Sequence, residues 1–321
     1  MTQFSAWPLG GGVWVGPVRK PRNSAANEKG SIHDDAVAQK LGFRGGTVAA
    51  SLHMEQFPPL LLHMFGPRWW KCGGLSLYFR YATTDLEAAQ CHAVAPMRPP
   101  TEDVRIEVWM EHPKSGGGGS ERIADGTASV GCPDLGSALR QRVQLIPEPG
   151  ELRILAQLSP GACCDGIPTR IPQSALDERL SVITEPLDAY TTGSPWSRPA
   201  LPPSLMVRAM RAVEPALLVR SGPVVGLFGA IEVQHLNGPL FVETDYLARG
   251  RVLAISETPK TEFFWYETTL TDPAEGTDVA SMLMMLRFMK ASSPLWAATN
   301  PGATADAVET LDRGGTDRGG A

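Results

Sequence analysis

The hydrophobic residues of this chain recur with the period of helices in some segments and of strands in others. Apolar residues at helical spacing fill residues 32–41, 51–65 and 204–214. Ser31 is placed to cap the first of these helices, and Gly42 to end it. In the second, Pro58 and Pro59 must kink or break the helix, because proline lacks an amide donor and clashes with the preceding turn.

After the second and third helical segments, apolar and polar residues alternate as in half-buried strands. The predicted strands are residues 75–81, 87–94, 104–111 and 123–130 in a first set, and 227–235, 240–248, 251–256, 262–269 and 281–289 in a second. The aromatic run 108–111 in the first set has an analogue at 264–267 in the second. We therefore predict an internal duplication, in which a helix followed by an antiparallel meander occurs twice.

The duplication divides the chain into segments of different character. We expect an N-terminal half over 1–150, an irregular linker or lid over 151–200, a C-terminal half over 201–298 and a disordered tail over 299–321. The tail has almost no apolar anchor, and the stretch 193–203 within and beyond the linker is rich in proline.

Composition narrows the classes of protein to consider. The 321 residues are 43% hydrophobic and 20% charged, which is typical of globular domains. A net charge of −5 gives no basic surface for nucleic acid, and no apolar run reaches the length of a membrane span. The start of the chain lacks signal-peptide features, so we expect a cytoplasmic protein. The five cysteines follow no zinc or redox spacing, and neither a metal nor a redox cofactor is expected.

The residues that could act in catalysis lie close together at the start of the first predicted helix. His33 is followed by Asp34 and Asp35, and the turn Gly45-Gly46 precedes the second helix. A histidine with carboxylates around it suits acid/base chemistry near neutral pH. Whether these carboxylates serve the histidine or only the start of the helix is open at this point.

The run from Asn27 to Asp35, followed by Gly42-Phe43-Arg44-Gly45-Gly46, resembles a motif of the MaoC-like (R)-specific enoyl-CoA hydratases. That motif is Gly-Asp-x-Asn-Pro-[Leu/Ile/Val]-His, followed by an acidic residue, a short helix, Gly-Phe and a glycine-bearing turn. The resemblance is clear over about residues 27–52. It implies an α+β double hotdog fold, in which each of two long central helices is wrapped by an antiparallel sheet.

The resemblance also implies an activity and a set of site residues. His33 matches the family's histidine, and Glu28 takes the position of its aspartate. Together they would hold and deprotonate the water that adds to a 2-enoyl thioester, and the reverse reaction would dehydrate a 3-hydroxyacyl thioester. The backbone N–H groups of Ala50 and Ser51 would polarise the thioester carbonyl.

The match is incomplete at one important position. Gly30 stands where the family has the asparagine that helps to hold the water. Asn27 and Asn23 are candidates to replace it, and Asp34 is a candidate to orient His33. The implied partner is an acyl thioester of CoA or of acyl-carrier protein, with a homodimer as one possible assembly.

Two other functions remain open from the sequence. Glu55 lies one turn into the second helical segment, where some hotdog thioesterases keep their catalytic carboxylate. An acyl-CoA thioesterase on the same fold is therefore the first alternative. The second is a protein without catalytic activity that binds an acyl group or a protein partner.

Overall fold

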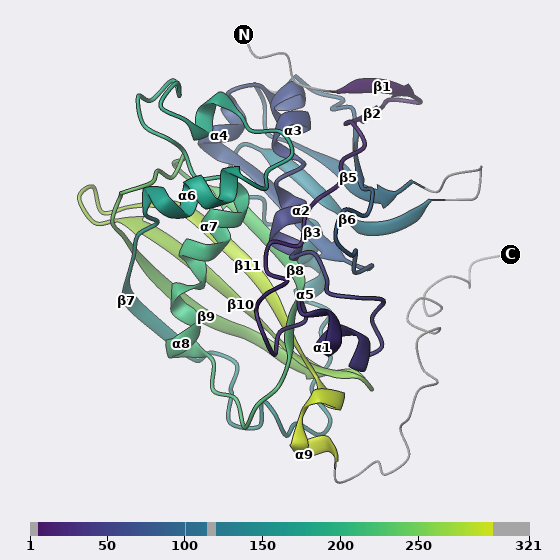
Figure 1. Cartoon of the computed structure of the whole chain (residues 1–321). Helices are drawn as coiled ribbons and strands as arrows, with labels where there is room; N and C mark the ends of the chain where they lie inside the picture. Colours follow the sequence, from purple (N-terminus) through teal and green to yellow (C-terminus); the bar gives the residue numbers. More distant parts are fainter. Residues whose placement is uncertain (1–5, 100, 114–119, 298–321) are drawn as a thin grey trace, which may run out of the picture.

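The computed structural model describes residues 6–99, 101–113 and 120–297, and the predicted tail lies outside them. In these residues the strands form one 11-stranded sheet in the order β1-β2-β4-β5-β6-β3-β8-β11-β10-β9-β7 (Figure 1). The strands are β1 (Trp7–Gly10), β2 (Val13–Val15), β3 (Gly73–Phe79), β4 (Gln90–Val94), β5 (Val104–His112), β6 (Glu121–Val130), β7 (Cys163–Thr169), β8 (Gly226–His235), β9 (Tyr246–Glu257), β10 (Thr261–Asp272) and β11 (Thr277–Met289). Each pair of neighbouring strands in this sheet is antiparallel.

Apart from the edge strand β1, which has no counterpart, the strand order is symmetric about its centre. Strands β3 and β8 pair there, with Leu77 opposite Ile231. Moving outward, β6, β5, β4 and β2 on one side correspond to β11, β10, β9 and β7 on the other. The two aromatic runs, Val108–Glu111 and Phe264–Glu267, therefore lie on equivalent strands, β5 and β10. The architecture repeats the same unit twice, as the periodicity predicts.

The helices are shorter than the resemblance implies. The described helices are α1 (Asp35–Lys40), α2 (Ala50–Met54), α3 (Pro58–Phe65), α4 (Arg68–Cys72), α5 (Ala138–Val143), α6 (Gln173–Leu180), α7 (Pro203–Met210), α8 (Glu214–Leu217) and α9 (Pro294–Ala297). Pro58 and Pro59 break the central helix as predicted, and α3 starts again at these prolines. The prediction of two long central helices was wrong, because each is divided into short segments.

Two other predictions of secondary structure fail in the second half. Residues 240–248 and 251–256 do not form two strands, because the single long strand β9 begins at Tyr246. The segment predicted as irregular, 151–200, contains β7 and α6. Helices α6 and α7 lie on one face of the sheet (Figure 1). The segment between the halves is thus part of the folded body.

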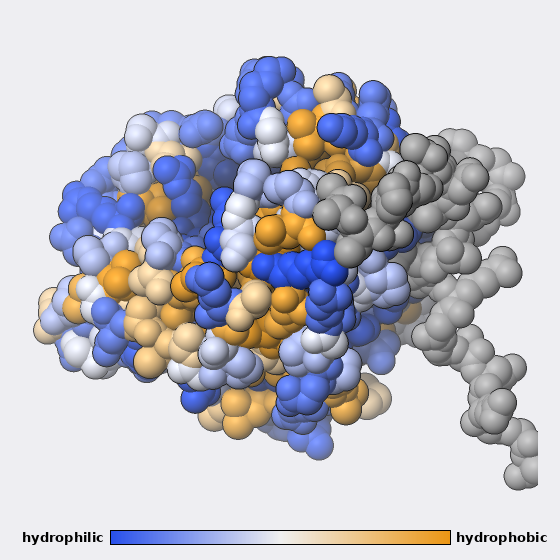
Figure 2. Space-filling view, turned by 90° about the horizontal axis from the view of Figure 1, so that it is seen from below, coloured by the Kyte–Doolittle hydropathy of each residue, from blue (hydrophilic) through white to orange (hydrophobic). Residues whose placement is uncertain are grey.

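The core lies on both faces of the central strands. Along β10, Phe264 and Tyr266 belong to the main cluster with the helices, while Phe263 and Trp265 pack in a smaller cluster with Leu139 of α5. Successive residues of a strand point to opposite faces, which produces this division. No helix in the described ranges is long and apolar enough to span a membrane. Seen from below, hydrophobic residues gather near the middle of the surface among hydrophilic ones (Figure 2).

Candidate functional site

The ring of His33 is fixed by a backbone carbonyl. Its Nδ1 lies 2.7 Å from the carbonyl oxygen of Thr47. Because a carbonyl oxygen only accepts hydrogen bonds, Nδ1 carries the proton, and Nε2 of the neutral ring keeps its lone pair. No hydrogen bond engages Nε2 among the described residues, and the side chain is half-buried. The ring of His33 is therefore held in one orientation against the turn before α2.

The backbone around His33 is held by Asn23, which precedes the motif, and by two residues of the motif, Asp35 and Gly46. The side-chain amide of Asn23 donates to the carbonyl oxygen of His33 at 2.8 Å. The carboxylate of Asp35 accepts from the backbone N–H of Gly46 at 2.6 Å. A Cβ at Gly46 would overlap the carbonyl oxygen of His33, so glycine permits the close approach of these two segments.

Asp34 serves the helix rather than the histidine ring. Its carboxylate accepts hydrogen bonds from the N–H groups of Ala36 and Val37, and it caps α1. Lys29 lies 3.0 Å from it and holds the pKa of Asp34 below its ordinary value. The predicted cap, Ser31, lies outside the helix, which begins at Asp35. Thr47, and not Asp34, makes the recorded hydrogen bond to the His33 ring.

The start of α2 is open. Its N-cap is Ala49, whose side chain makes no capping hydrogen bond. The first N–H groups of a helix have no partner within it, so those of Ala50 and Ser51 are available to another group. Ala50 is half-buried, while the side chain of Ser51 is buried. Thr47, which bonds to the His33 ring, lies three positions before the first residue of this helix, so the ring and these N–H groups are connected by a short stretch of chain.

The structure does not bring Glu28 and His33 into hydrogen-bonding contact. Glu28 is exposed on the turn that leads to His33. No hydrogen bond or ion pair joins its carboxylate to another described residue. Asn27 is exposed on the same turn, and Gly30 lies there with a φ of 79°. The residue that does contact the His33 segment is Asn23.

Glu55 lies in a second polar cluster, in which Glu55, Ser204 and Tyr190 are buried. Its Oε1 accepts from the backbone N–H of Ser204 at 2.6 Å, at the start of α7. Burial raises the pKa of Glu55 to about 7, although its contacts with Ser204 and the charge of Arg179 act in the opposite direction. Four buried atoms here have no described partner: Glu55 Oε2, Ser204 Oγ, Tyr190 OH and Arg179 Nε. Such groups are costly to bury unless water or a ligand satisfies them.

The second cluster occupies the position that matches the His33 site in the other half. Residues 32–41 and 171–180 share an initial isoleucine, a central alanine, a basic residue and a final leucine at the same spacing. In the second copy Pro172 stands in place of His33. Sequence reasoning missed this copy, although the shared spacing was a signal that could have revealed it. One half thus keeps the histidine and an open helix start, while Glu55 occupies the helix start in the other.

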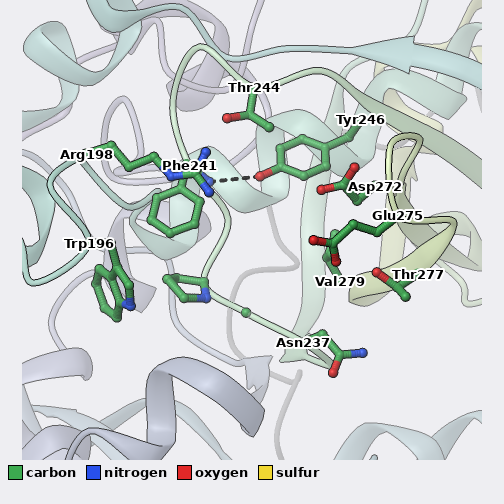
Figure 3. Close-up of a pocket in the computed structure, with 12 residues that line it drawn as sticks. Trp196, Arg198, Asn237, Phe241, Thr244, Tyr246, Asp272, Glu275, Thr277 and Val279 are labelled. Atoms are coloured by element: carbon green, nitrogen blue, oxygen red, sulfur yellow. Dashed lines mark hydrogen bonds between the residues drawn. The ribbon is translucent and has the colours of Figure 1, made fainter.

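Two cavities are described in the folded part of the chain, and one of them shares residues with these groups. The smaller, of about 310 Å³, opens between residues 22–24 and the end of α6, and it is lined by Asn23 and Arg179. The larger, of about 400 Å³, is lined by residues of the second half only. Figure 3 shows Arg198 over the ring of Phe241 there, with Asp272 and Glu275 across the opening. Asn23 links the smaller cavity to the backbone of His33, because its side-chain amide donates to the His33 carbonyl oxygen.

No group of three or more histidine, cysteine or acidic side chains in the described part of the chain is arranged to hold a metal ion. The cysteines described there are all free.

The fold is that of a double hotdog protein, and only the first half has a histidine at the position of His33. No protein-family model matches the sequence, and no curated protein matches it significantly. Solved structures do match in fold. A MaoC domain protein from Chloroflexus aurantiacus is 14% identical, with a TM-score of 0.57 over 88% of this chain and 96% of that one.

Two other solved structures agree. A MaoC-like dehydratase is 13% identical, with a TM-score of 0.51 over 87% of this chain and 98% of that one. Rv0216 from Mycobacterium tuberculosis, which has a double hotdog fold, is 11% identical, with a TM-score of 0.52 over 90% of this chain and 96% of that one. The double hotdog fold predicted from the sequence is therefore confirmed.

Proposed function

We propose that this protein hydrates a 2-enoyl thioester, or dehydrates the corresponding 3-hydroxyacyl thioester, with His33 as the acid/base group. The observation that carries the proposal is the hydrogen bond from His33 Nδ1 to the carbonyl oxygen of Thr47. It leaves Nε2 as the basic nitrogen, and the acceptor Thr47 shortly precedes a helix start that has no side-chain cap.

The proposed reaction adds one water across the double bond. Nε2 of His33 accepts a proton from the water whose oxygen bonds to carbon 3. The protonated ring then supplies the proton that carbon 2 takes. Negative charge builds on the thioester oxygen in between, and the N–H groups of Ala50 and Ser51 are the donors proposed to stabilise it. Because α2 has only five residues, these individual donors matter more than a helix dipole.

Glu28 has a role in this proposal only in the complex with substrate. Its exposed carboxylate lies five residues before His33. It makes no hydrogen bond or ion pair with the described residues that would have to break before it binds water. We propose that it holds the attacking water once the thioester covers the turn. The fold shared with MaoC-like dehydratases supports this class of substrate, carried on CoA or on acyl-carrier protein.

The test is turnover of enoyl-CoA substrates of graded chain length and branching, followed by loss of the enoyl chromophore and by identification of the 3-hydroxyacyl product. Hydration that depends on His33 supports the proposal. Absence of turnover across the panel, with thioesters still bound, would instead indicate a binding protein without catalytic activity.

A second candidate, an acyl-thioester hydrolase, is favoured by Glu55. A buried carboxyl with a pKa of about 7 and an unpartnered Oε2 suits a general base or nucleophile. This function predicts release of free thiol that Glu55→Gln abolishes and His33→Asn leaves intact. The same two variants give the reverse pattern if the protein is a hydratase.

A further inference from the structure

The lining of the smaller cavity indicates which acyl group the substrate has. This inference rests on the proposed reaction at His33. The near wall of the cavity is the segment Arg22–Ser24, and its far wall is the end of α6, which contributes Glu178, Arg179, Ser181 and Val182. Asn23 in the near wall lies 2.8 Å from the carbonyl oxygen of His33. The cavity therefore borders a residue that holds the backbone of His33.

The lining of the cavity has two arginines, Arg22 and Arg179, and one acidic residue, although the charge of Arg179 is also attracted by the buried Glu55. Neither Arg22 nor Arg179 makes a described hydrogen bond or ion pair through its side chain, and Nε of Arg179 is buried. Glu178 is the single acidic residue in the lining. Many other arginines of the described chain are paired with carboxylates, such as Arg105 with Asp134. A guanidinium stays charged at any physiological pH, so a half-buried unpaired one favours an anionic ligand.

The lining is unsuited to an aliphatic tail. Val182 is its only apolar side chain. An alkyl chain placed here would displace water from the arginines, the serines and Asn23 without returning hydrogen bonds, which costs free energy. At about 310 Å³, the cavity is also at the small end of the range for ligand sites. A short polar group fits these properties.

The phosphates of the thioester carrier are too distant from the reacting carbonyl to be this group. An extended pantetheine arm has the length of a peptide of four to five residues, which is on the order of 15 Å. The cavity wall, in contrast, contacts the segment that carries His33. The anionic group must therefore belong to the acyl part of the substrate, within a few bonds of the reacting carbons.

The geometry points to a substrate whose acyl group ends in a carboxylate, which Arg22 and Arg179 bind in the cavity beside His33. Arginine forms paired hydrogen bonds with a carboxylate, which gives both affinity and orientation. The terminal carboxylate would fix carbons 2 and 3 relative to the ring of His33. A short dicarboxylic acid bound to its carrier through one carboxyl is the chemical class that this site selects.

The experiment compares two ligands of equal chain length that differ only in the terminal group. Glutaryl- and pentanoyl-CoA analogues, with a methylene in place of the thioester sulfur, resist both hydration and hydrolysis. Isothermal titration with the full-length protein should give at least tenfold tighter binding of the glutaryl analogue. In the double variant Arg22→Gln/Arg179→Gln, this ratio should fall to about twofold or less.

The matched control removes the same charge elsewhere. Arg98 and Arg220 are exposed and do not line the cavity. The double variant Arg98→Gln/Arg220→Gln should keep the wild-type ratio, and Arg22→Lys/Arg179→Lys, which preserves charge but not the fork geometry, should give an intermediate one. Equal binding of both analogues by the wild type would overturn the inference, as would a ratio that the cavity variant leaves unchanged or that the control variant lowers equally.

Binding and turnover separate this inference from the proposed reaction. Hydration of enoyl thioesters without any preference for the carboxylated ligand would leave the reaction intact and overturn the inference about the acyl group. A preference that depends on both arginines, with no turnover of a carboxylated enoyl thioester, would instead overturn the reaction.

Discussion

The carboxylate of Glu55 in the first half accepts a hydrogen bond from the backbone N–H of Ser204 in the second, at 2.6 Å. This contact makes the two halves unequal. The start of α7 is occupied by a buried side chain, whereas the start of α2 is open and has His33 beside it. The position matching His33 in the second half is Pro172, which has no titratable group. Under the proposed function, these differences place a single site in the first half.

The first prediction concerns the pH dependence that Glu55 gives to stability. Its pKa is raised from 4.5 to about 7 in the folded protein. Between these values the folded state holds more protons than the unfolded state, so the free energy of unfolding falls as pH rises. The stabilisation is complete below pH 4.5 and lost above about pH 7. A shift of this size corresponds to about 3 kcal/mol.

Glu55→Gln isolates this effect, because glutamine keeps an acceptor for the Ser204 N–H and does not ionise. Urea unfolding measures the free energy of unfolding of both proteins at pH 5 and pH 8. The value for the variant relative to the wild type should be higher at pH 8 than at pH 5 by about 2–3 kcal/mol. A constant difference between the two proteins across this range would mean that Glu55 ionises normally.

His235 should produce the opposite trend in acid. It is buried against Trp69 and Trp70, neither ring nitrogen has a described partner, and burial lowers its pKa to about 4. Its stabilising contribution is present above pH 6.5 and is lost as pH falls through 4. The free energy of unfolding of His235→Phe should therefore fall less than that of the wild type between pH 7.5 and pH 4.5. His63→Phe, at an exposed histidine, is the control and should follow the wild-type dependence.

Gly46 and Gly45 make a matched pair for testing the packing of the motif. A Cβ at Gly46 would overlap the His33 carbonyl oxygen, so Gly46→Ala should displace His33 and destabilise the fold by about 1–3 kcal/mol. The nearest atom to a Cβ at Gly45 is an Asp35 oxygen at 3.2 Å, so Gly45→Ala should cost less. Thermal unfolding of both variants measures this order, and equal effects would contradict the geometry.

The strands were the most predictable part of this fold. Along β5, buried and exposed residues alternate regularly, and the predicted strand 104–111 agrees with Val104–His112. The error at 240–248 has a physical reason. Leu240, Phe241 and Val242 are buried in a loop before β9, and an apolar run in a buried loop has the same composition as a strand.

The site was only partly predictable. The spacing around His33 indicated the correct turn, because Asp35, Gly46 and Thr47 interact within 14 residues of it. The contact between Glu55 and Ser204 joins residues 149 positions apart, and only the packing of the two halves creates it. The hydrogen bond from Asn23 likewise depends on a chain path that no local periodicity specifies.

The most direct test of the account is the rate of enoyl-thioester hydration by His33→Asn beside that of the wild type. The asparagine amide can still donate to Thr47, but the basic nitrogen is lost. We expect the variant to unfold at nearly the same temperature and to lose at least about 100-fold in kcat. Unchanged kcat in the folded variant would contradict the assignment of His33 as the acid/base group.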